Sequence, residues 1–351
     1  MMIRFALGMV TGCLGLLGLV AASYGLLAVA RPESLPAPPI TRFAALDEKL
    51  RFLRRNPGYD PAIIAIGSSV AWRQLDGAAF DAASGREHAF LNAATVHLQI
   101  HQSRAMLDFY LARYRNVRHV LLMTGLPDFG NCSSEPESLM MESAAADYAF
   151  EGWPSAWFYM RFFAPQRFAQ SALTLAERQQ PLTGDLWLDR WGSGPLDVPD
   201  EMLRGLRYGA VQPDPACLQA LLDLAQDMRR RGIEFTVVIP PVHPHYRQRH
   251  PEAMAALCRI AARLEPLTAA GAFQLILRQD DSRYRAEDFF DAFHLQYPAV
   301  RRLSEDIAQS LHGLSPADAL IASSRRPGLR DVPPRRERPA RNQPQGCEQM
   351  I

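Results

Sequence analysis

The chain has 351 residues, with 38 Lys and Arg against 37 Asp and Glu, so its formal net charge is +1. This length allows one large domain or two small ones with a sizeable buried core. Because the charges nearly cancel, no global field favours nucleic acid or an acidic substrate, and we expect no nucleic-acid partner. The cysteines lack the close paired spacing of zinc sites. Four of them lie beyond the first apolar run and can form one or two disulfides in an oxidising compartment: Cys132, Cys217, Cys258 and Cys347.

An uncharged apolar segment runs from Phe5 to Ala30. It is longer than the roughly 20 residues that cross a bilayer as a helix, which predicts a transmembrane anchor. A cleaved signal peptide is the alternative, since Ala28-Val29-Ala30 fits a small-residue cleavage site, although the apolar run is longer than that of a signal peptide. Both interpretations send the rest of the chain across the membrane. We therefore expect a single-pass protein of the bacterial inner (cytoplasmic) membrane with a periplasmic C-terminal domain, in which residues 1–40 form the anchor and a proline-rich spacer.

Beyond the spacer, short apolar runs alternate with segments of helical periodicity. The predicted strands are 62–66, 89–93, 119–124, 234–239 and 273–277, and the predicted helices are 41–54, 98–114, 217–231, 251–270 and 299–311. Strands that alternate with helices imply an α/β fold, in which a mostly parallel sheet of about five strands is covered on both faces.

Two segments depart from this alternation. Residues 128–214 form an insertion rich in aromatic side chains, which suit a substrate lid, a glycan-stacking platform or a surface that dips into lipid; packing against the sheet or against one another is the alternative. Residues 313–351 are rich in Arg and Pro and poor in apolar residues, which predicts a disordered tail. Such a tail is either solvated or in contact with anionic lipid head groups.

The first stretch with chemical interest follows the first predicted strand. The apolar run ends at Gly67 and passes into two hydroxyls, Ser68 and Ser69. In parallel α/β sheets this edge binds ligands, because the loops after the strands converge there and the next helix presents unpaired N–H groups. A serine here is therefore a candidate nucleophile. The alternative is a helix N-cap, for which serine is a favoured residue.

The second stretch, Asp291-Ala292-Phe293-His294, lies in the loop after the fifth predicted strand, at the same edge of the sheet. An aspartate three residues before a histidine can orient the imidazole through one ring nitrogen and leave the other free to take a proton from a serine. This arrangement activates a hydroxyl that is otherwise a weak nucleophile. The pattern predicts a catalytic set of Ser69, His294 and Asp291, although a hydrogen-bonded structural histidine is the commoner role of Asp-x-x-His.

These motifs resemble the SGNH (GDSL-type) hydrolase superfamily over roughly Ile63 to Leu311. Gly67-Ser68-Ser69 matches the first block, Gly-Asp-Ser, with Ser68 in place of the aspartate, and Asp291 with His294 matches the last. The resemblance implies a flavodoxin-like three-layer sandwich over residues 41–312. With the anchor, it is most similar to membrane-tethered acyl-transfer proteins such as the D-alanyl transfer protein of teichoic acids and the alginate O-acetylation proteins. It implies a serine esterase or O-acyltransferase acting on acyl esters of an envelope or exported glycan, or on a small ester, without a metal or organic cofactor.

The two middle blocks of the superfamily supply the oxyanion hole together with the backbone of the nucleophile Ser69. After Asn92 the position aligned with the second-block glycine is about His97, whose backbone N–H can still donate. The third block, Gly-x-Asn-Asp, is represented by Gly125-Leu126-Pro127-Asp128, in which proline replaces the amide donor. Losing one such donor costs on the order of 100- to 1000-fold in turnover. Asn131 is a candidate replacement.

The loop after the fourth predicted strand is a possible metal site. His243 and His245 follow the fourth predicted strand, but they supply at most two metal ligands with no carboxylate or cysteine close in sequence. We therefore predict no metal site and assign His243 to a substrate-contacting loop. The missing amide at Pro127 and the aromatic insertion leave open a catalytically weak SGNH-like module that binds glycan or partner proteins in an envelope assembly.

Overall fold

The computed structural model describes residues 2–31, 35–136, 142–199, 206, 208–269 and 271–311. The chain forms two compact units: unit 1 contains Met1–Pro57 and Leu139–Gln180, and unit 2 contains Gly58–Ser138 and Pro181–Ile351. The predicted tail, 313–351, lies outside the described residues. The predicted bounds of the enzyme-like domain, 41–312, stay a prediction.

Unit 2 is built on a parallel sheet of five strands in the order β2-β1-β3-β4-β5. This is a doubly wound strand order, in which the chain reverses direction across the sheet after β2. All four residues of β1 are buried, as expected of a strand covered on both faces. The prediction of a mostly parallel five-stranded sheet is therefore confirmed. The strands are β1 (Ile63–Ile66), β2 (Phe90–Asn92), β3 (His119–Met123), β4 (Glu234–Ile239) and β5 (Gln274–Leu277).

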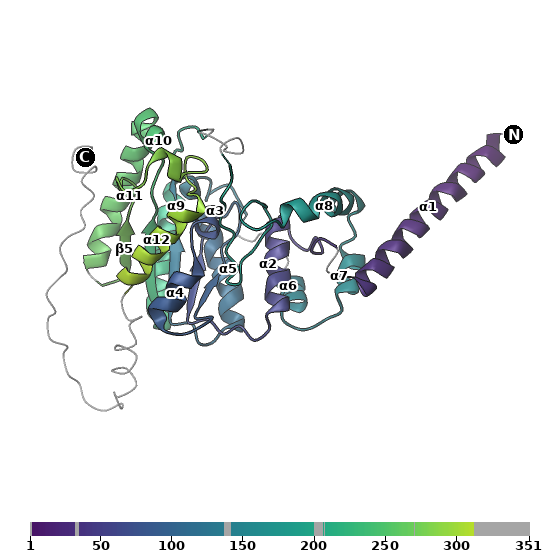
Figure 1. Ribbon diagram of the computed structural model, residues 1–351, viewed down its shortest axis with the longest axis horizontal. Helices are drawn as coiled ribbons and strands as arrows, with labels where there is room; N and C mark the ends of the chain where they lie inside the picture. Colours follow the sequence, from purple (N-terminus) through teal and green to yellow (C-terminus); the bar gives the residue numbers. More distant parts are fainter. Residues whose placement is uncertain are drawn as a thin grey trace, which may run out of the picture. The chain divides into compact units, whose positions relative to one another are not determined.

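Helices cover both faces of this sheet (Figure 1). The connections β1 to β2 and β2 to β3 run in opposite directions, so right-handed crossovers place α4 and α5 on opposite faces. Helix α12 packs against α4, and α9 packs against α5. The helical segments of unit 2 are α3 (Ser69–Arg73), α4 (Gly77–Ser84), α5 (Ile100–Arg113), η2 (Leu126–Phe129), α9 (Pro215–Arg231), α10 (Pro244–Arg249), α11 (Pro251–Ala269), η4 (Ala286–Asp288) and α12 (Tyr297–Ser310).

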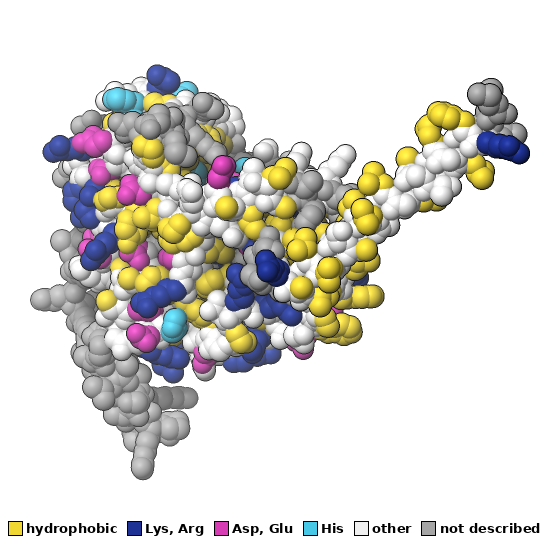
Figure 2. Space-filling view, turned by 45° about the vertical axis from the view of Figure 1, so that its right-hand side comes forward, with side chains coloured by type: hydrophobic (Ala, Val, Ile, Leu, Met, Phe, Trp, Pro, Cys, Tyr) yellow, Lys and Arg dark blue, Asp and Glu magenta, His cyan; other side chains and the backbone are white. Residues whose placement is uncertain are grey.

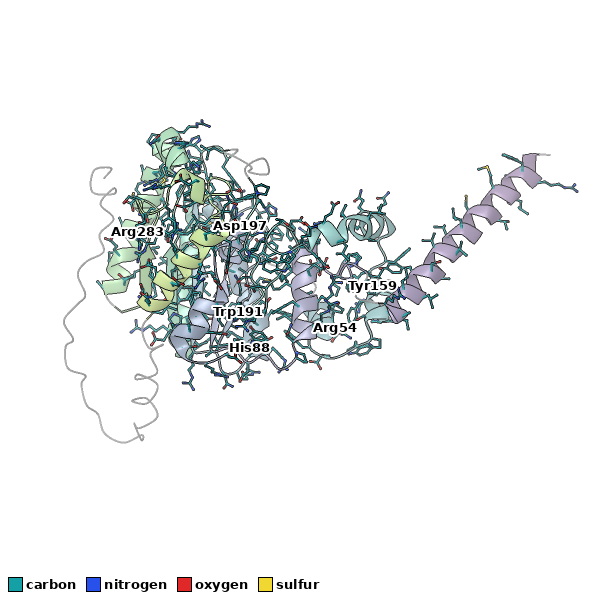
Figure 3. All side chains as sticks on the ribbon, in the orientation of Figure 1. Arg54, His88, Tyr159, Trp191, Asp197 and Arg283 are labelled. Atoms are coloured by element: carbon teal, nitrogen blue, oxygen red, sulfur yellow. A yellow bond between two sulfur atoms is a disulfide. The ribbon has the colours of Figure 1, made fainter. Side chains whose placement is uncertain are left out.

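The predicted insertion is divided between the two units. Its first part contributes α6 (Glu142–Ala149), α7 (Ser155–Arg161) and α8 (Pro165–Arg178) to unit 1. Residues 181–199 belong to unit 2, and Trp191 of this segment is labelled in Figure 3. The indole Nε1 of Trp191 donates to Asp81 over 2.8 Å, and the Trp191 carbonyl accepts from the N–H of Asn92 over 2.9 Å. A disulfide joins Cys132 to Cys217 at the start of α9, one of the pairings that the sequence left open.

Unit 1 gathers the N-terminal segment and the inserted helices. Helix α1 (Met2–Ala30) precedes the spacer, and α2 (Ala44–Arg55) follows it. Within α2, Glu48 and Arg51 form a buried ion pair that binds the spacer: Glu48 accepts from the N–H of Ala37 over 2.9 Å, and Arg51 donates to the carbonyl of Leu35. Because both charges are paired and hydrogen-bonded to backbone, their burial is tolerated. Residues 35–40 are therefore a packed segment.

Helix α1 is long and apolar enough to cross a membrane over Arg4–Ala30. Its side chains are exposed along most of its length, and Figure 2 shows hydrophobic side chains continuing down the helix to unit 1. Near its C-terminal end, Tyr24 and Ala28 are instead buried with Leu35 and Tyr159 of unit 1. By length and composition α1 fits both a membrane anchor and a signal sequence.

Candidate active site

Ser69 occupies the turn between β1 and α3. Gly67 precedes it with φ +135, and a Cβ there would collide with the carbonyl oxygen of Met123 in β3, so only glycine lets the turn approach β3 this closely. Ser68 is the N-cap of α3, its Oγ accepting from the N–H of Val70 over 3.1 Å. Ser69 is the first helical residue and is half-buried. The capping role therefore falls to Ser68, which leaves the hydroxyl of Ser69 for other contacts.

The hydroxyl of Ser69 meets His294, 225 residues later in the chain. Nε2 of His294 lies 3.0 Å from Oγ of Ser69, and Nδ1 lies 2.9 Å from each carboxylate oxygen of Asp291. Both His294 and Asp291 are buried. The structure thus brings together the three side chains predicted from the sequence, in the order serine, imidazole and carboxylate that proton transfer from a hydroxyl needs.

The carboxylate of Asp291 is held by its own loop. One oxygen accepts from the backbone N–H of Phe293 over 2.9 Å and from that of His294 over 3.0 Å. Burial raises the pKa of Asp291, but the neighbouring His294 and these hydrogen bonds lower it by more than burial raises it. The net pKa therefore lies below the usual value. Asp291 is therefore ionised at neutral pH and fixes Nδ1 of the imidazole as its hydrogen-bond donor.

Gln74 ties this loop to the helix of the nucleophile. Its amide donates to the carbonyl of Phe293 over 2.8 Å and accepts from the N–H of Leu295 over 3.3 Å, so it binds the backbone on both sides of His294. Gln74 is the C-cap position of α3 and is fully buried. The sequence interpretation missed this residue, although it stands within the same stretch as Ser69.

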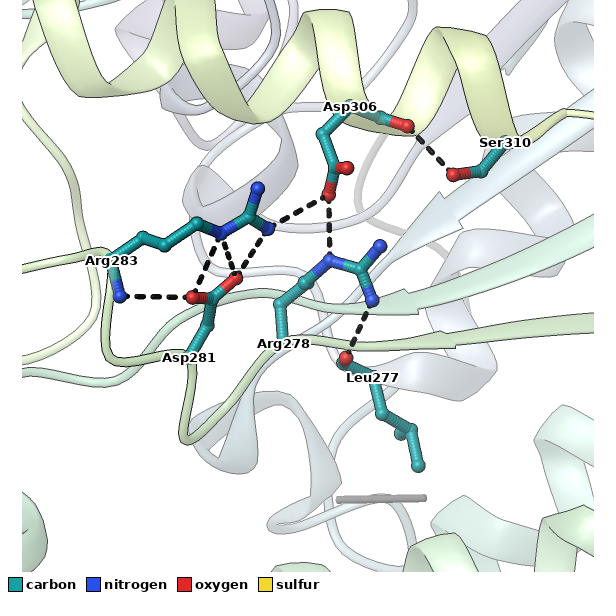
Figure 4. A network of polar contacts seen from close by, with 6 residues as sticks. All are labelled: Leu277, Arg278, Asp281, Arg283, Asp306 and Ser310. Carbon is teal, nitrogen blue, oxygen red and sulfur yellow. Dashed lines mark hydrogen bonds and ion pairs between the residues drawn. The ribbon is translucent and has the colours of Figure 1, made fainter. Parts of the chain in front are cut away.

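The segment between β5 and His294 begins with an ion-pair network that anchors it to α12 (Figure 4). Arg278, directly after β5, donates to Asp306 over 2.7 Å, and Arg283 pairs with both Asp281 and Asp306. Burial raises the pKa of Asp281, but its hydrogen bonds with Arg283 lower the pKa by a larger amount, so it stays below the usual value. Because Arg283 is exposed, we assign its contacts no more than about 1 kcal/mol of stabilisation.

A second carboxylate, Asp128, lies on the other side of the serine turn. One of its oxygens accepts from the N–H of Gly125 over 2.9 Å and from the hydroxyl of Thr124 over 3.1 Å, and the hydroxyl of Ser68 also donates to this carboxyl. Burial raises the pKa of Asp128 to about 6, although these hydrogen bonds and the nearby His294 act in the opposite direction. In the sequence, Asp128 is the last residue of the poorly matched third block, and nothing there predicts its contact with Ser68.

The predicted oxyanion and substrate residues take different places. The amide of Asn92 donates to the carbonyl of Ala71 in α3 and to the hydroxyl of Ser193, both near 3 Å, so it links α3 to the segment that contains Ser193. His97 and Asn131 are exposed and adopt left-handed backbone conformations with φ 57 and 58. A left-handed φ at His97 is of interest, because this is the position aligned with a glycine, the residue that adopts such a backbone most easily.

His243 lies beside the loop of the imidazole. Its N–H donates to the carbonyl of Ala292 over 3.1 Å, and its ring lies 5.1 Å from that of Phe289. Nδ1 accepts from the N–H of His245, and burial together with the neighbouring His245 lowers the pKa of His243. The described part of the chain contains no group of three or more His, Cys, Asp or Glu placed to hold a metal ion.

Pro127 stands in the turn after β3, as the second residue of η2. It has no amide hydrogen, and the turn is closed instead by the N–H of Asp128, which donates to the carbonyl of Gly125 over 3.0 Å. Backbone N–H groups can still donate to a developing oxyanion. The nearest by sequence is the N–H of Ser69 itself, which as the first residue of α3 has no acceptor within the helix. The roles predicted for Asn92, His97 and Asn131 at an oxyanion hole stay predictions.

No family model matches this chain, and no curated protein and no solved structure match it either.

Proposed function

We propose that this chain is a membrane-anchored serine esterase or O-acyltransferase of the SGNH type, which acts outside the cytoplasm on acyl esters of an envelope or exported glycan. The observation that carries the proposal is the 3.0 Å approach of His294 Nε2 to Ser69 Oγ, with Asp291 on the opposite ring nitrogen. A structural histidine needs one partner for its imidazole. Here the second nitrogen meets a hydroxyl at the edge of the sheet where ligands bind in open α/β folds.

The position of each group in the fold supports the SGNH type. Ser69 follows β1, an inner strand between β2 and β3, and the Asp291–His294 loop follows the edge strand β5, as in the first and last blocks of that superfamily. The doubly wound order of the strands suits its three-layer sandwich. The amide of Asn92 binds Ala71 and Ser193, and its predicted oxyanion role stays a prediction.

The mechanism follows from this geometry. Oγ of Ser69 attacks the carbonyl carbon of an acyl ester while Nε2 of His294 takes the hydroxyl proton. The tetrahedral intermediate collapses when His294 passes this proton to the leaving alkoxide, which releases an alcohol and leaves an acyl group on Ser69. His294 then takes a proton from the acceptor as it attacks the acyl carbonyl, and it returns that proton to Oγ of Ser69 when the second tetrahedral intermediate breaks the acyl–serine bond. Water as acceptor gives a free acid, and a sugar hydroxyl gives a new ester, so Ser69 is restored in both cases.

The packing of α1 supports a retained anchor. Tyr24 and Ala28 are buried against unit 1, and the ring of Tyr24 lies 5.5 Å from that of Tyr159 in edge-to-face contact. Cleavage after Ala30 would remove both side chains and expose the rings that they cover. A segment that the folded chain buries is better suited to an anchor than to a signal peptide.

A fluorophosphonate probe tests the catalytic proposal, because it phosphonylates a serine that a histidine has activated. We expect one adduct per full-length chain, placed on Ser69 by tandem mass spectrometry, and no adduct in Ser69→Ala. Ser84→Ala, which removes a hydroxyl at the end of α4, is the matched control and should label like the wild type.

Two results would count against catalysis. The first is a wild type that stays unlabelled while a control serine hydrolase reacts, and the second is an adduct that persists in Ser69→Ala. Glycan binding that survives in Ser69→Ala would then favour the binding module.

A further inference from the structure

An exposed aromatic surface lies on α7 and its flanks. We call Trp153, Trp157 and Met160 the α7 face; each of these large side chains is at least half-exposed. The opposite side of α7 is buried through Phe158 and Tyr159. Scattered exposed apolar residues need no explanation, but two tryptophans and a methionine grouped on one short segment do.

This surface adjoins the end of α1. Tyr159 of α7 lies against Tyr24 of α1, and its hydroxyl donates to the carbonyl of Pro36 over 2.7 Å. Phe163, which follows α7, contacts Tyr24 at 5.4 Å between ring centroids. Figure 3 shows Tyr159 beside this end of α1. The two helices therefore meet within unit 1. The depth of Tyr24 in a bilayer would then also set the depth of α7.

The length of α1 sets that depth in a bilayer. The segment from Arg4 to Ser23 has about 20 residues, the number needed to cross the hydrocarbon core. Tyr24 comes next and is the first large side chain of α1 that unit 1 buries. If Arg4–Ser23 fills the core, Tyr24 and the adjoining α7 lie at the boundary between acyl chains and head groups.

The residue types of the α7 face fit this boundary. Tryptophan and tyrosine are enriched at membrane interfaces, because their rings are apolar and their N–H or O–H groups are polar. Arg161 at the end of α7 and Arg31 directly after α1 are both exposed and suit the lipid phosphates. A lipid contact is favoured over a soluble partner because this surface adjoins the helix that is long and apolar enough to cross a membrane.

We propose that the α7 face inserts into the lipid head-group boundary beside the anchor. It then gives unit 1 a second membrane contact, which fixes its depth and prevents rotation about the axis of α1. The inference rests on the retained anchor of the proposed function but not on its catalytic part.

Brominated lipids test this contact in the full-length protein reconstituted into lipid nanodiscs. Lipids brominated near the head group should quench a component of the tryptophan emission more strongly than lipids brominated deep in the acyl chains. The double variant Trp153→Phe/Trp157→Phe should lose that component. Trp187→Phe, which removes an indole from unit 2, is the matched control and should keep it.

The outcomes separate the contact from the anchor and from catalysis. The proposal is overturned if each brominated lipid quenches the wild type no more than it quenches the double variant. Intact mass would show whether α1 is present; a protein that begins after Ala30 would overturn both the contact and the anchor. Fluorophosphonate labelling of that same sample would show whether the catalytic proposal survives.

Discussion

Two buried carboxylates flank the Ser69–His294 pair, and their pKa values move in opposite directions. Asp291 accepts hydrogen bonds from an imidazole and from two backbone N–H groups, and its pKa falls below the usual value although it is buried. Asp128 has mainly neutral donors, and burial raises its pKa to about 6. Burial raises the pKa of both, and the net direction depends on whether the hydrogen bonds and the neighbouring His294 lower that pKa by more than burial raises it. Such divergence of neighbouring carboxyl groups is typical of sites with divided roles.

Asp291→Asn is expected to have the largest effect. An asparagine keeps the size of the side chain but no longer fixes the tautomer of His294 or stabilises its cation, so hydrolysis of p-nitrophenyl acetate should fall on the order of 10⁴-fold. Asp288→Asn, in the same loop, is the control and should retain most of the activity, because its carboxylate binds Arg302 and the N–H of Arg285. A loss of less than about tenfold in Asp291→Asn would remove Asp291 from the mechanism.

The same comparison shows how far the sequence could predict this site. Ser69, Asp291 and His294 could be found because each lies in a loop or turn that follows a predicted strand, and the ends of parallel strands share one edge. Gln74 and Asp128 could not, because their roles depend on contacts made by packing: Gln74 meets Phe293 at a separation of 219 residues. Whether an amide such as that of Asn92 holds a helix or faces a substrate also depends on the tertiary structure.

The fold shows a similar limit. Alternating periodicity predicts the parallel sheet, since each apolar run is short and each helix between them is long enough to cross over. It does not predict that Leu139–Gln180 joins the N-terminal segment in unit 1. That association depends on contacts such as Tyr24 with Tyr159 and the hydrogen bond of Arg54 to the carbonyl of Tyr148, which no local pattern encodes.

Asp128→Asn should change the pH dependence of stability. The pKa of Asp128 is about 6 in the folded chain, above its usual value of 3.8, so its favourable contribution is complete at low pH and is lost as the pH rises through 6. An asparagine does not titrate. The free energy of unfolding of the variant minus that of the wild type should therefore increase by about 2 to 3 kcal/mol between pH 4 and pH 8.

Urea unfolding across this pH range measures that difference. Other titrating groups are common to both proteins and largely cancel in this difference. A difference that stays constant or decreases with pH would mean that Asp128 carries its charge without cost in the folded chain.

Ser68→Ala should have the smallest effect and shows what the serine contributes to Asp128. The variant loses the N-cap contact with the N–H of Val70, worth about 1 kcal/mol, and one hydrogen bond to the carboxylate. Since that bond lowers the pKa of Asp128, its loss should move the fall in stability to higher pH. Ser68→Thr keeps a hydroxyl and should resemble the wild type in both respects. If Ser68→Ala loses stability by the same amount at every pH, Ser68 acts as a helix cap alone, and the charge state of Asp128 is set by burial and by the turn after β3.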